Sequence, residues 1–241
     1  MTAITDTETV DGWFGQGPRP ALRTERLVRS YDGPPEVLAL AAVDLEVSPG
    51  ELTAVVGTTG SGKTTLIRIL ALIDRPTAGR YLLDGIDVGD LPDGERSSLR
   101  AGRIGVSLGP GALLADRSVA ENLDLALVYA GFDRAERMTR ITDAMSRVSL
   151  EHRAASPVGE LSVGERRRAD LARSLVRSPS LLLVDEPTRE LDGAAATSLI
   201  TLLRELHRTG VTVIVTTDDT RVAGVADRAL KLARGRIEAE V

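Results

Sequence analysis

The sequence predicts an α/β protein with a mostly parallel sheet, and three observations carry this prediction. Apolar, strand-like runs alternate with helix-like segments along the chain. The run 181–184 is apolar throughout, and 211–215 is apolar apart from Thr212, as in strands covered on both faces. Aromatic residues make up only 2% of the 241 residues, so Leu, Val, Ala and Ile must fill the core. Such alternation implies parallel strands joined by right-handed crossovers.

The elements can be placed from the N-terminus onward. Residues 1–22 are polar and rich in Thr, Gly and Pro, which predicts a flexible tail. Trp13 and Phe14 within it either dock onto the folded domain or anchor a partner. Alternation over 42–47 predicts a strand, and 52–56 predicts a short buried strand that ends at a glycine.

Further along the chain, helical spacing and turn signals divide the sequence into regular elements. Helices are expected over 65–72, 118–130, 135–148, 161–176 and 194–207. A hairpin is expected over 79–90, and strand-like pieces over 228–238.

Composition and charge narrow the class of protein. The net charge is -5 at pH 7 and no basic–aromatic alternation occurs, so we expect no nucleic-acid partner. The absence of Cys excludes disulfides, and two His argue against a histidine metal site. No apolar run approaches the roughly 18 to 20 residues that span a bilayer, and the acidic N-terminus lacks a secretory signal. We therefore expect a cytoplasmic chain, with any membrane spans on another polypeptide.

The segment between the strand 52–56 and the helix 65–72 fits the phosphate-loop pattern G-x4-G-K-T. Its glycines let backbone N–H groups converge on phosphate oxygens, and the helix adds the positive end of its dipole. Lys63 is expected to reach the β- and γ-phosphates, and Thr64 to offer its hydroxyl to Mg²⁺. A glycine-rich turn with a solvated lysine is the alternative, which the strand–loop–helix setting disfavours. The predicted nucleotide-binding residues are Gly57, Thr58, Thr59, Gly60, Ser61, Gly62, Lys63, Thr64 and Thr65.

Two acidic residues follow the apolar run 181–184. Because ligands of open α/β sheets bind beyond the carboxyl ends of strands, Asp185 is placed to hold Mg²⁺. Glu186 is placed to orient or deprotonate an attacking water, as the catalytic residue. The alternative is that the two acids merely end a strand before a turn at Pro187, and the presence of a phosphate loop in the same chain disfavours it.

With the segment Leu161-Ser162-Val163-Gly164-Glu165 ahead of the acid pair, these motifs resemble the ATPase subunit of ABC transporters. The order also includes Glu190-Leu191-Asp192, and the resemblance runs from about Leu27 to Ile237. The stretches 73–79, 84–88 and 119–123 resemble the subgroup that serves lipoprotein release, macrolide export and cell division.

The resemblance implies a P-loop NTPase (RecA-like) core with an antiparallel β subdomain. It places the ATP-binding domain over 23–241 and an inserted helical subdomain over about 110–175. It further implies two subunits meeting head to tail with ATP and Mg²⁺ between them, and a transmembrane permease partner at the inner face of the membrane. The pairing of subunits, homodimer or heterodimer, stays open, and no metal other than nucleotide-bound Mg²⁺ is expected.

Family roles carry over onto individual positions. Tyr31 matches the aromatic residue that stacks on adenine, although an ordinary half-buried tyrosine is the alternative. Ser162, Gly164 and Glu165 belong to the signature that meets the ATP of the opposite subunit, and Asp192 contacts across the dimer. Taken alone, the signature is a capped helix start, with Ser162 as N-cap and Glu165 closing a capping box.

The chain departs from the family pattern at three positions. Gly109 stands where a glutamine normally ligates Mg²⁺, Thr217 where a histidine normally bonds the γ-phosphate, and Val163 where a glycine is usual. Loss of one preorganised donor typically costs on the order of 10² to 10³ in rate, so two losses predict slow hydrolysis. The residues expected to bind nucleotide and metal nevertheless remain: Lys63, Thr64, Asp185 and Glu186.

Two functional hypotheses follow. The first is an ATP-binding subunit of an ABC-type membrane complex, with weak or partner-dependent ATPase activity that acts on its partner through the helical subdomain and the region 109–115. The second is a nucleotide-gated dimerisation module that binds ATP without turning it over. A small-molecule kinase or a GTPase is disfavoured, because a base-reading Asn-Lys-x-Asp segment is absent. The cargo and its direction of movement cannot be derived from these residues.

Overall fold

Two β-sheets organise residues 19–240, the part of the chain that the computed structural model describes. One sheet has six strands in the order β10-β9-β3-β8-β7-β6, in which all neighbours run parallel except β10, which is antiparallel to β9. The other is an antiparallel sheet in the order β2-β1-β4-β5. The strands are β1 (Leu22–Tyr31), β2 (Val37–Val47), β3 (Leu52–Val56), β4 (Ala78–Leu83), β5 (Ile86–Asp87), β6 (Ile104–Ser107), β7 (Leu181–Asp185), β8 (Thr212–Thr217), β9 (Arg228–Ala233) and β10 (Arg236–Glu240). The predicted α/β class with a mostly parallel sheet and an antiparallel part is confirmed.

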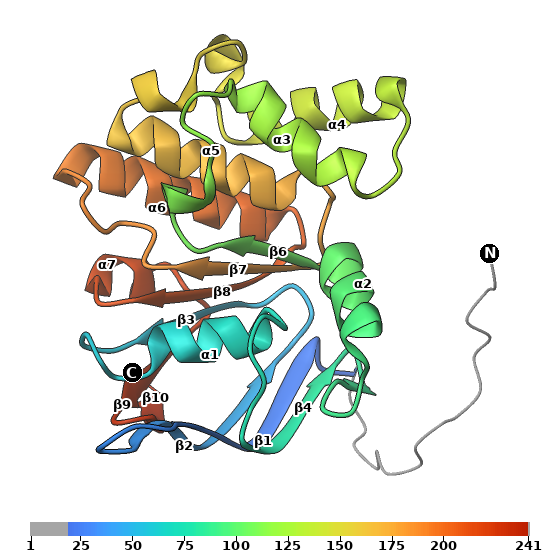
Figure 1. Ribbon diagram of the computed structural model, residues 1–241. Helices are drawn as coiled ribbons and strands as arrows, with labels where there is room; N and C mark the ends of the chain where they lie inside the picture. The colour runs from blue at the N-terminus through green and yellow to red at the C-terminus, as the bar shows by residue number, and fades with distance from the viewer. Residues whose placement is uncertain (1–18, 241) are drawn as a thin grey trace.

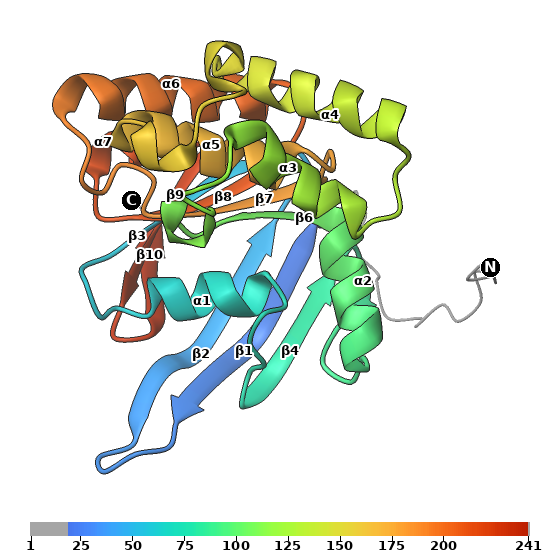
Figure 2. The ribbon, with the colours of Figure 1, turned by 45° about the horizontal axis from the view of Figure 1, so that its top comes forward.

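Helices cover both faces of the parallel sheet (Figures 1 and 2). Helix α1 lies between the two sheets, whereas α5 and α6 cover the opposite face, with α3 and α4 beyond them. The helices are α1 (Lys63–Leu70), α2 (Asp93–Arg103), α3 (Val119–Val128), α4 (Arg134–Arg147), α5 (Val163–Leu175), α6 (Gly193–Arg208) and α7 (Thr220–Ala223). Helices α3 to α5 fall inside the predicted insert over 110–175, whose status as a separate subdomain stays a prediction.

The central strands are apolar because they separate two cores. In β7, Leu182 and Val184 pack into the core beneath α5 and α6, whereas Leu181 and Leu183 pack into the core that α1 shares with the antiparallel sheet. Successive side chains of a strand point to opposite faces, so a strand covered on both sides needs apolar residues throughout. The uninterrupted run 181–184 is explained by this arrangement.

Strand β1 and helix α2 are among the elements that the sequence analysis did not predict. Strand β1 was not predicted, because charged residues interrupt its apolar positions; its Leu22 is fully buried, so the predicted tail boundary falls inside a strand. Helix α2 was not predicted either, because its one fully buried side chain is Arg96 rather than an apolar residue. Trp13 and Phe14 lie outside the described residues.

The parallel register brings three strand ends to one edge. Val56 at the end of β3 pairs with Thr217 of β8, and Asp185 at the end of β7 pairs with Thr216. The glycine-rich loop that follows β3 and the acid pair that ends β7 therefore lie beside each other, although more than 100 residues separate them in the sequence.

Candidate functional site

The loop between β3 and α1 is shaped by glycines. A Cβ atom on Gly57 would lie 2.4 Å from the carbonyl oxygen of Leu232, and one on Gly62 would lie 2.5 Å from that of Ala39. Gly62 also has a φ of +110°, a conformation that L side chains rarely adopt. Only glycine fits at these two positions.

Polar groups of the loop lack partners in the described part of the chain. Helix α1 begins at Lys63 with no side-chain cap, which leaves first-turn N–H groups without a capping side chain. The Oγ atom of Ser61 is buried and has no hydrogen-bond partner among residues 19–240. Uncapped N–H donors and a buried free hydroxyl at a helix N-terminus are the donor set that a phosphate group satisfies. The loop therefore fits the phosphates of a nucleotide.

Lys63 and Glu186 form a buried ion pair. The Nζ atom of Lys63 lies 3.0 Å from Oε1 of Glu186, and the two side chains are 5% and 8% exposed. Lys63 also donates to the carbonyl oxygens of Gly57 and Thr58. A second cation, the guanidinium of Arg189, lies 3.7 Å from the same Glu186 oxygen. The carboxylate of Glu186 thus faces the phosphate loop between two positive charges.

Oxygen atoms from three elements meet next to this pair. The hydroxyl of Thr64 in α1 donates to Oδ2 of Asp185 at 2.9 Å, and the hydroxyl of Thr216 in β8 donates to Oδ1. Mg²⁺ prefers oxygen ligands, so Thr64 and Asp185 fit that metal. Sequence reasoning missed Thr216, because only the parallel register of β7 and β8 brings it to Asp185.

Tyr31 lies at the end of β1 in a fixed orientation. Its hydroxyl donates to Oδ2 of Asp74 at 2.9 Å, and the guanidinium of Arg29 lies 4.4 Å from its ring centroid. Arg29 also pairs with Asp74 at 3.0 Å. These contacts hold the ring, and the predicted adenine stacking stays a prediction.

The signature segment forms the start of α5. Ser162 is the N-cap and Glu165 completes a capping box, as predicted. Hydrogen bonding from the Ser162 backbone N–H and from Arg153 lowers the pKa of Glu165 to about 2. A Cβ on Gly164 would meet only the Cβ of Ala195 at 3.6 Å, an ordinary contact. Nothing in the described chain therefore requires glycine at 164.

Asp192 and the remaining departures from the family pattern have local roles. Asp192 is the N-cap of α6 and accepts a hydrogen bond from the Ala195 N–H at 2.8 Å. Thr217 is fully buried, and its hydroxyl accepts from the Asp219 N–H at 3.0 Å. Val163 is the first residue of α5. The Thr217 hydroxyl is thus engaged within its own loop.

Gly109 follows β6 and contacts α5. Its φ is +101°, and a Cβ there would lie 3.0 Å from Nη1 of Arg167. Its N–H donates to Asp170 of α5 at 3.1 Å. Sequence reasoning missed Arg167 and Asp170, because they lie in a charged helical stretch that is typical of a solvated face.

Comparison with known proteins agrees with this geometry. Residues 40–189 match the ABC transporter family. The macrolide export ATP-binding/permease protein MacB of Hahella chejuensis is 37% identical over 222 residues, and that of Rhodospirillum rubrum is 39% identical over 221 residues. These matches cover 92% and 91% of this chain but 34% of each relative, so the chain spans about a third of their length. The predicted macrolide-export resemblance is confirmed.

Solved structures give the same result. The dimeric, post-hydrolysis ATP-binding cassette MJ0796, bound to ADP and Pi, has a TM-score of 0.84 at 30% identity, covering 91% of this chain and 97% of that one. The cbiO1 protein of Clostridium perfringens, part of the ABC transporter complex cbiONQ, has a TM-score of 0.83 at 29% identity, covering 92% and 88%. Within residues 19–240, no helix is both long and apolar enough to cross a membrane. The chain belongs to the ABC transporter family, in which it is an ATP-binding cassette with the P-loop NTPase fold of an ABC-type ATPase.

Proposed function

We propose that this chain is the ATP-binding subunit of a membrane transport complex and that it binds Mg·ATP at the loop from Gly57 to Thr65. The observation that carries the proposal is the meeting of Lys63 with Glu186 and of Thr64 with Asp185 at one sheet edge. Lys63 would contact the terminal phosphates, and Thr64 and Asp185 would hold Mg²⁺. The metal, when bound, neutralises phosphate charge.

Glu186 is the proposed general base or orienting group for the attacking water. In the structure its carboxylate is paired with Lys63 and Arg189, and it accepts from the Asp218 N–H at 3.3 Å. A nucleotide that draws Lys63 towards its phosphates would free the Glu186 carboxylate for that role. The adenine would stack on Tyr31.

We expect hydrolysis to be slow. Gly109 supplies no side chain, and Thr217 is fully buried and too short to span the gap that a histidine would fill. Val163 places a branched side chain where close approach of backbone to phosphate favours glycine. Each missing transition-state donor costs on the order of 10² to 10³ in rate.

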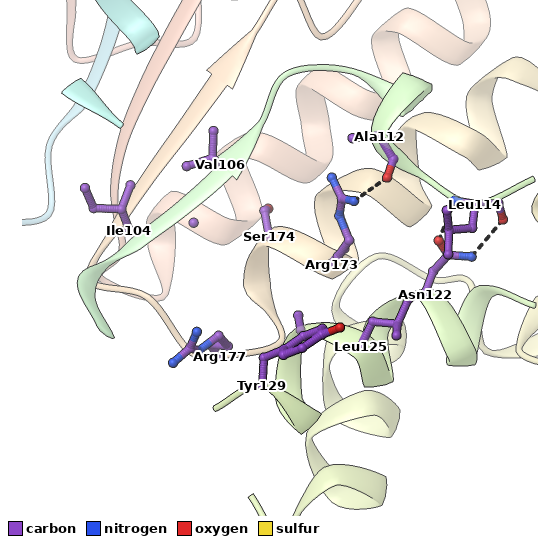
Figure 3. A pocket seen from close by; sticks show the side chains of 12 residues that line it. Ile104, Val106, Ala112, Leu114, Asn122, Leu125, Tyr129, Arg173, Ser174 and Arg177 are labelled. Atoms are coloured by element: carbon purple, nitrogen blue, oxygen red, sulfur yellow. Dashed lines mark hydrogen bonds between the residues drawn. The ribbon is translucent and has the colours of Figure 1, made fainter. Parts of the chain in front are cut away.

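A transmembrane partner is part of the proposal. An open cavity of about 340 Å³ lies between β6, the segment 110–114, α3 and α5 (Figure 3). Its rim carries the residues Leu114, Leu125 and Tyr129, which are 47%, 41% and 90% exposed. An exposed apolar rim beside a groove marks an interaction surface. We assign it to a short helix of a permease subunit, which would hold this chain at the cytoplasmic face of the membrane.

The site would be completed by a second ATP-binding subunit, identical or different. No contact within the described part of the chain requires a glycine at position 164. Ser162 and Glu165 lie at the start of α5, and Asp192 lies at the start of α6. Helix N-termini attract phosphate. We infer that these residues face the ATP of the opposite subunit, as in a head-to-tail dimer.

Steady-state ATPase measurement on the purified chain and its Glu186→Gln variant tests the function. We expect low Mg²⁺-dependent turnover that Glu186→Gln abolishes while Mg·ATP affinity is retained. Binding without turnover above background in either protein would instead indicate a regulatory dimerisation module. Absence of Mg·ATP binding would contradict both.

A further inference from the structure

A buried cation beside the site has no part in the function proposed above. Arg167 lies in the second turn of α5 and is 9% exposed. Its Nη2 donates to the carbonyl oxygen of Arg189 at 3.2 Å. Its Nε is buried without a hydrogen-bond partner in the described part of the chain. The guanidinium therefore keeps unused donor capacity in a desolvated place.

The guanidinium occupies the space into which a side chain at position 109 would point. A Cβ built on Gly109 would lie 3.0 Å from Nη1 and 3.9 Å from Cζ of Arg167. With a φ of +101°, position 109 also disfavours any L side chain. A glycine at 109 and an arginine at 167 are thus two parts of one local arrangement.

The backbone of this loop is fastened to the same helix. Asp170 is fully buried, and its Oδ2 accepts from the Gly109 N–H at 3.1 Å and from the Ser107 hydroxyl at 2.7 Å. Arg173 donates to its Oδ1 at 3.0 Å. Helix α5 therefore fixes both the position of the loop and the position of the guanidinium.

The charges around Arg167 connect it to the nucleotide site. Burial lowers the pKa of its guanidinium, and the carboxylates of Asp170, Glu190 and Asp185 oppose that shift. Arginine stays charged at neutral pH despite such a shift. Geometry gives the same connection, because Arg167 donates to the carbonyl oxygen of Arg189, whose own guanidinium lies 3.7 Å from Oε1 of Glu186 in the proposed site. Guanidinium groups suit phosphate because their planar fork donates several hydrogen bonds.

We propose that Arg167 is a nucleotide-binding residue, which supplies from α5 the interaction with the terminal phosphate that Gly109 cannot provide. This inference rests on the proposed function, in which Mg·ATP binds at the loop from Gly57 to Thr65. It also links the signature helix, whose start faces the opposite subunit, to the nucleotide of its own subunit.

A purely structural role for Arg167 leads to a different result. In that case its function is to hold the Arg189 carbonyl, and a neutral donor of similar length would suffice. Arg167→Gln keeps a donor but removes the charge, whereas Arg167→Lys keeps the charge but removes the fork. The two variants separate charge towards phosphate from support of the loop.

Equilibrium titration of the full chain with Mg·ATP and with Mg·ADP tests the inference. We expect Arg167→Gln to weaken ATP binding about 10-fold while ADP binding changes less than about 2-fold. Arg167→Lys should keep most of the preference for ATP. The ratio of the two affinities is informative even for a partly unfolded variant, because unfolding weakens both nucleotides by the same factor.

Arg168 supplies the matched control. It is the next residue of α5, and its guanidinium donates away from the site, to Val148 and Ser198. Arg168→Gln should leave the ATP-to-ADP ratio unchanged. An unchanged ratio in Arg167→Gln, with both nucleotides bound by the wild-type chain, would overturn the role of Arg167 alone. Failure of the wild-type chain to bind either nucleotide would overturn the proposed function itself.

Discussion

The phosphate loop and the loop after β6 both belong to the proposed nucleotide site, but contacts within the chain fix the two loops in different ways. The phosphate loop is constrained by backbone sterics, because Cβ atoms at Gly57 and Gly62 would overlap carbonyl oxygens. Its partners Asp185 and Glu186 stand at the end of a parallel strand, where the sheet register determines their place. The phosphate loop needs few particular side chains beyond those proposed to contact the nucleotide.

The loop after β6 depends instead on side chains of α5. Gly109 is held by Asp170, and Arg167 fills the space beside it. The buried carboxylate of Asp170 in α5 accepts hydrogen bonds from the loop at Gly109 and from strand β6 at Ser107. If the proposals above hold, the groups that bind a nucleotide persist here while a different set responds to its terminal phosphate.

Removal of the Asp170 carboxylate should have the largest effect. Asp170→Ala leaves the Gly109 N–H and the Arg173 guanidinium without their buried partner, which typically costs about 3 to 5 kcal/mol of folding free energy. Urea unfolding measures the loss. As the control, Asp124→Ala breaks the partly exposed pair with Arg137 and should cost less than about 1 kcal/mol. A loss below about 1 kcal/mol in Asp170→Ala would show that the loop does not depend on α5.

Lys63 tests the phosphate-loop half of the comparison. Lys63→Ala removes the cation that pairs with Glu186, and it should weaken Mg·ATP about 100-fold, which corresponds to about 2.7 kcal/mol. Calorimetric titration gives the affinity. Arg68→Ala changes a basic residue on the exposed side of the same helix and should leave the affinity unaltered. Similar affinities for wild type and Lys63→Ala would remove the phosphate loop from the proposed site.

The sequence alone predicted where the phosphate loop and the acid pair lie in the fold, because short local patterns determine both. A glycine pattern between a strand and a helix specifies the loop, and an apolar run before two acids specifies their place at a sheet edge. The register that adds Thr216 to Asp185 needs the order of the strands, which no short segment encodes. The positions of Asp185 and Glu186 at the sheet edge were therefore predictable, whereas the hydroxyl partner of Asp185 was not.

The sequence predicted the other half only as a set of departures. Gly109 could be recognised as a missing side chain, but the position of Arg167 beside it depends on packing between segments almost 60 residues apart. A run of three arginines at 166–168 indicates a solvated helix face, and only the fold shows that the middle one is buried. Strand β1 was missed because charged residues interrupt its apolar positions, and helix α2 because its buried residue is Arg96 rather than an apolar one.

The signature residues Ser162 and Glu165 form the capping box of α5, and the stability that this box provides should depend on pH. Glu165 has a pKa of about 2 in the folded chain, below its ordinary value of 4.5. The unfolded chain therefore binds more protons between these values, so the stabilisation is complete above pH 4.5 and is lost as the pH falls towards 2. Glu165→Gln keeps an acceptor for the cap but loses the pair with Arg153.

We expect wild type to exceed Glu165→Gln by roughly 1 kcal/mol at pH 7, with the difference shrinking below pH 4.5. Urea midpoints measured from pH 7 to pH 3 give the difference at each pH. A difference that stays constant over this range would show that the charge of Glu165 does not stabilise the start of α5.

Substitution of Gly164 should have the smallest effect on the fold, and it separates the stability of the single chain from formation of the proposed dimer. The Cβ of Gly164→Ala would meet only Ala195 at 3.6 Å, and alanine favours a helix over glycine, so stability should rise by about 0.5 kcal/mol. In light scattering with Mg·ATP, the double variant Gly164→Ala, Glu186→Gln should nevertheless form less dimer than Glu186→Gln alone. Reduced stability would mean that the chain's own fold requires this glycine, and an undiminished dimer would remove Gly164 from the proposed interface.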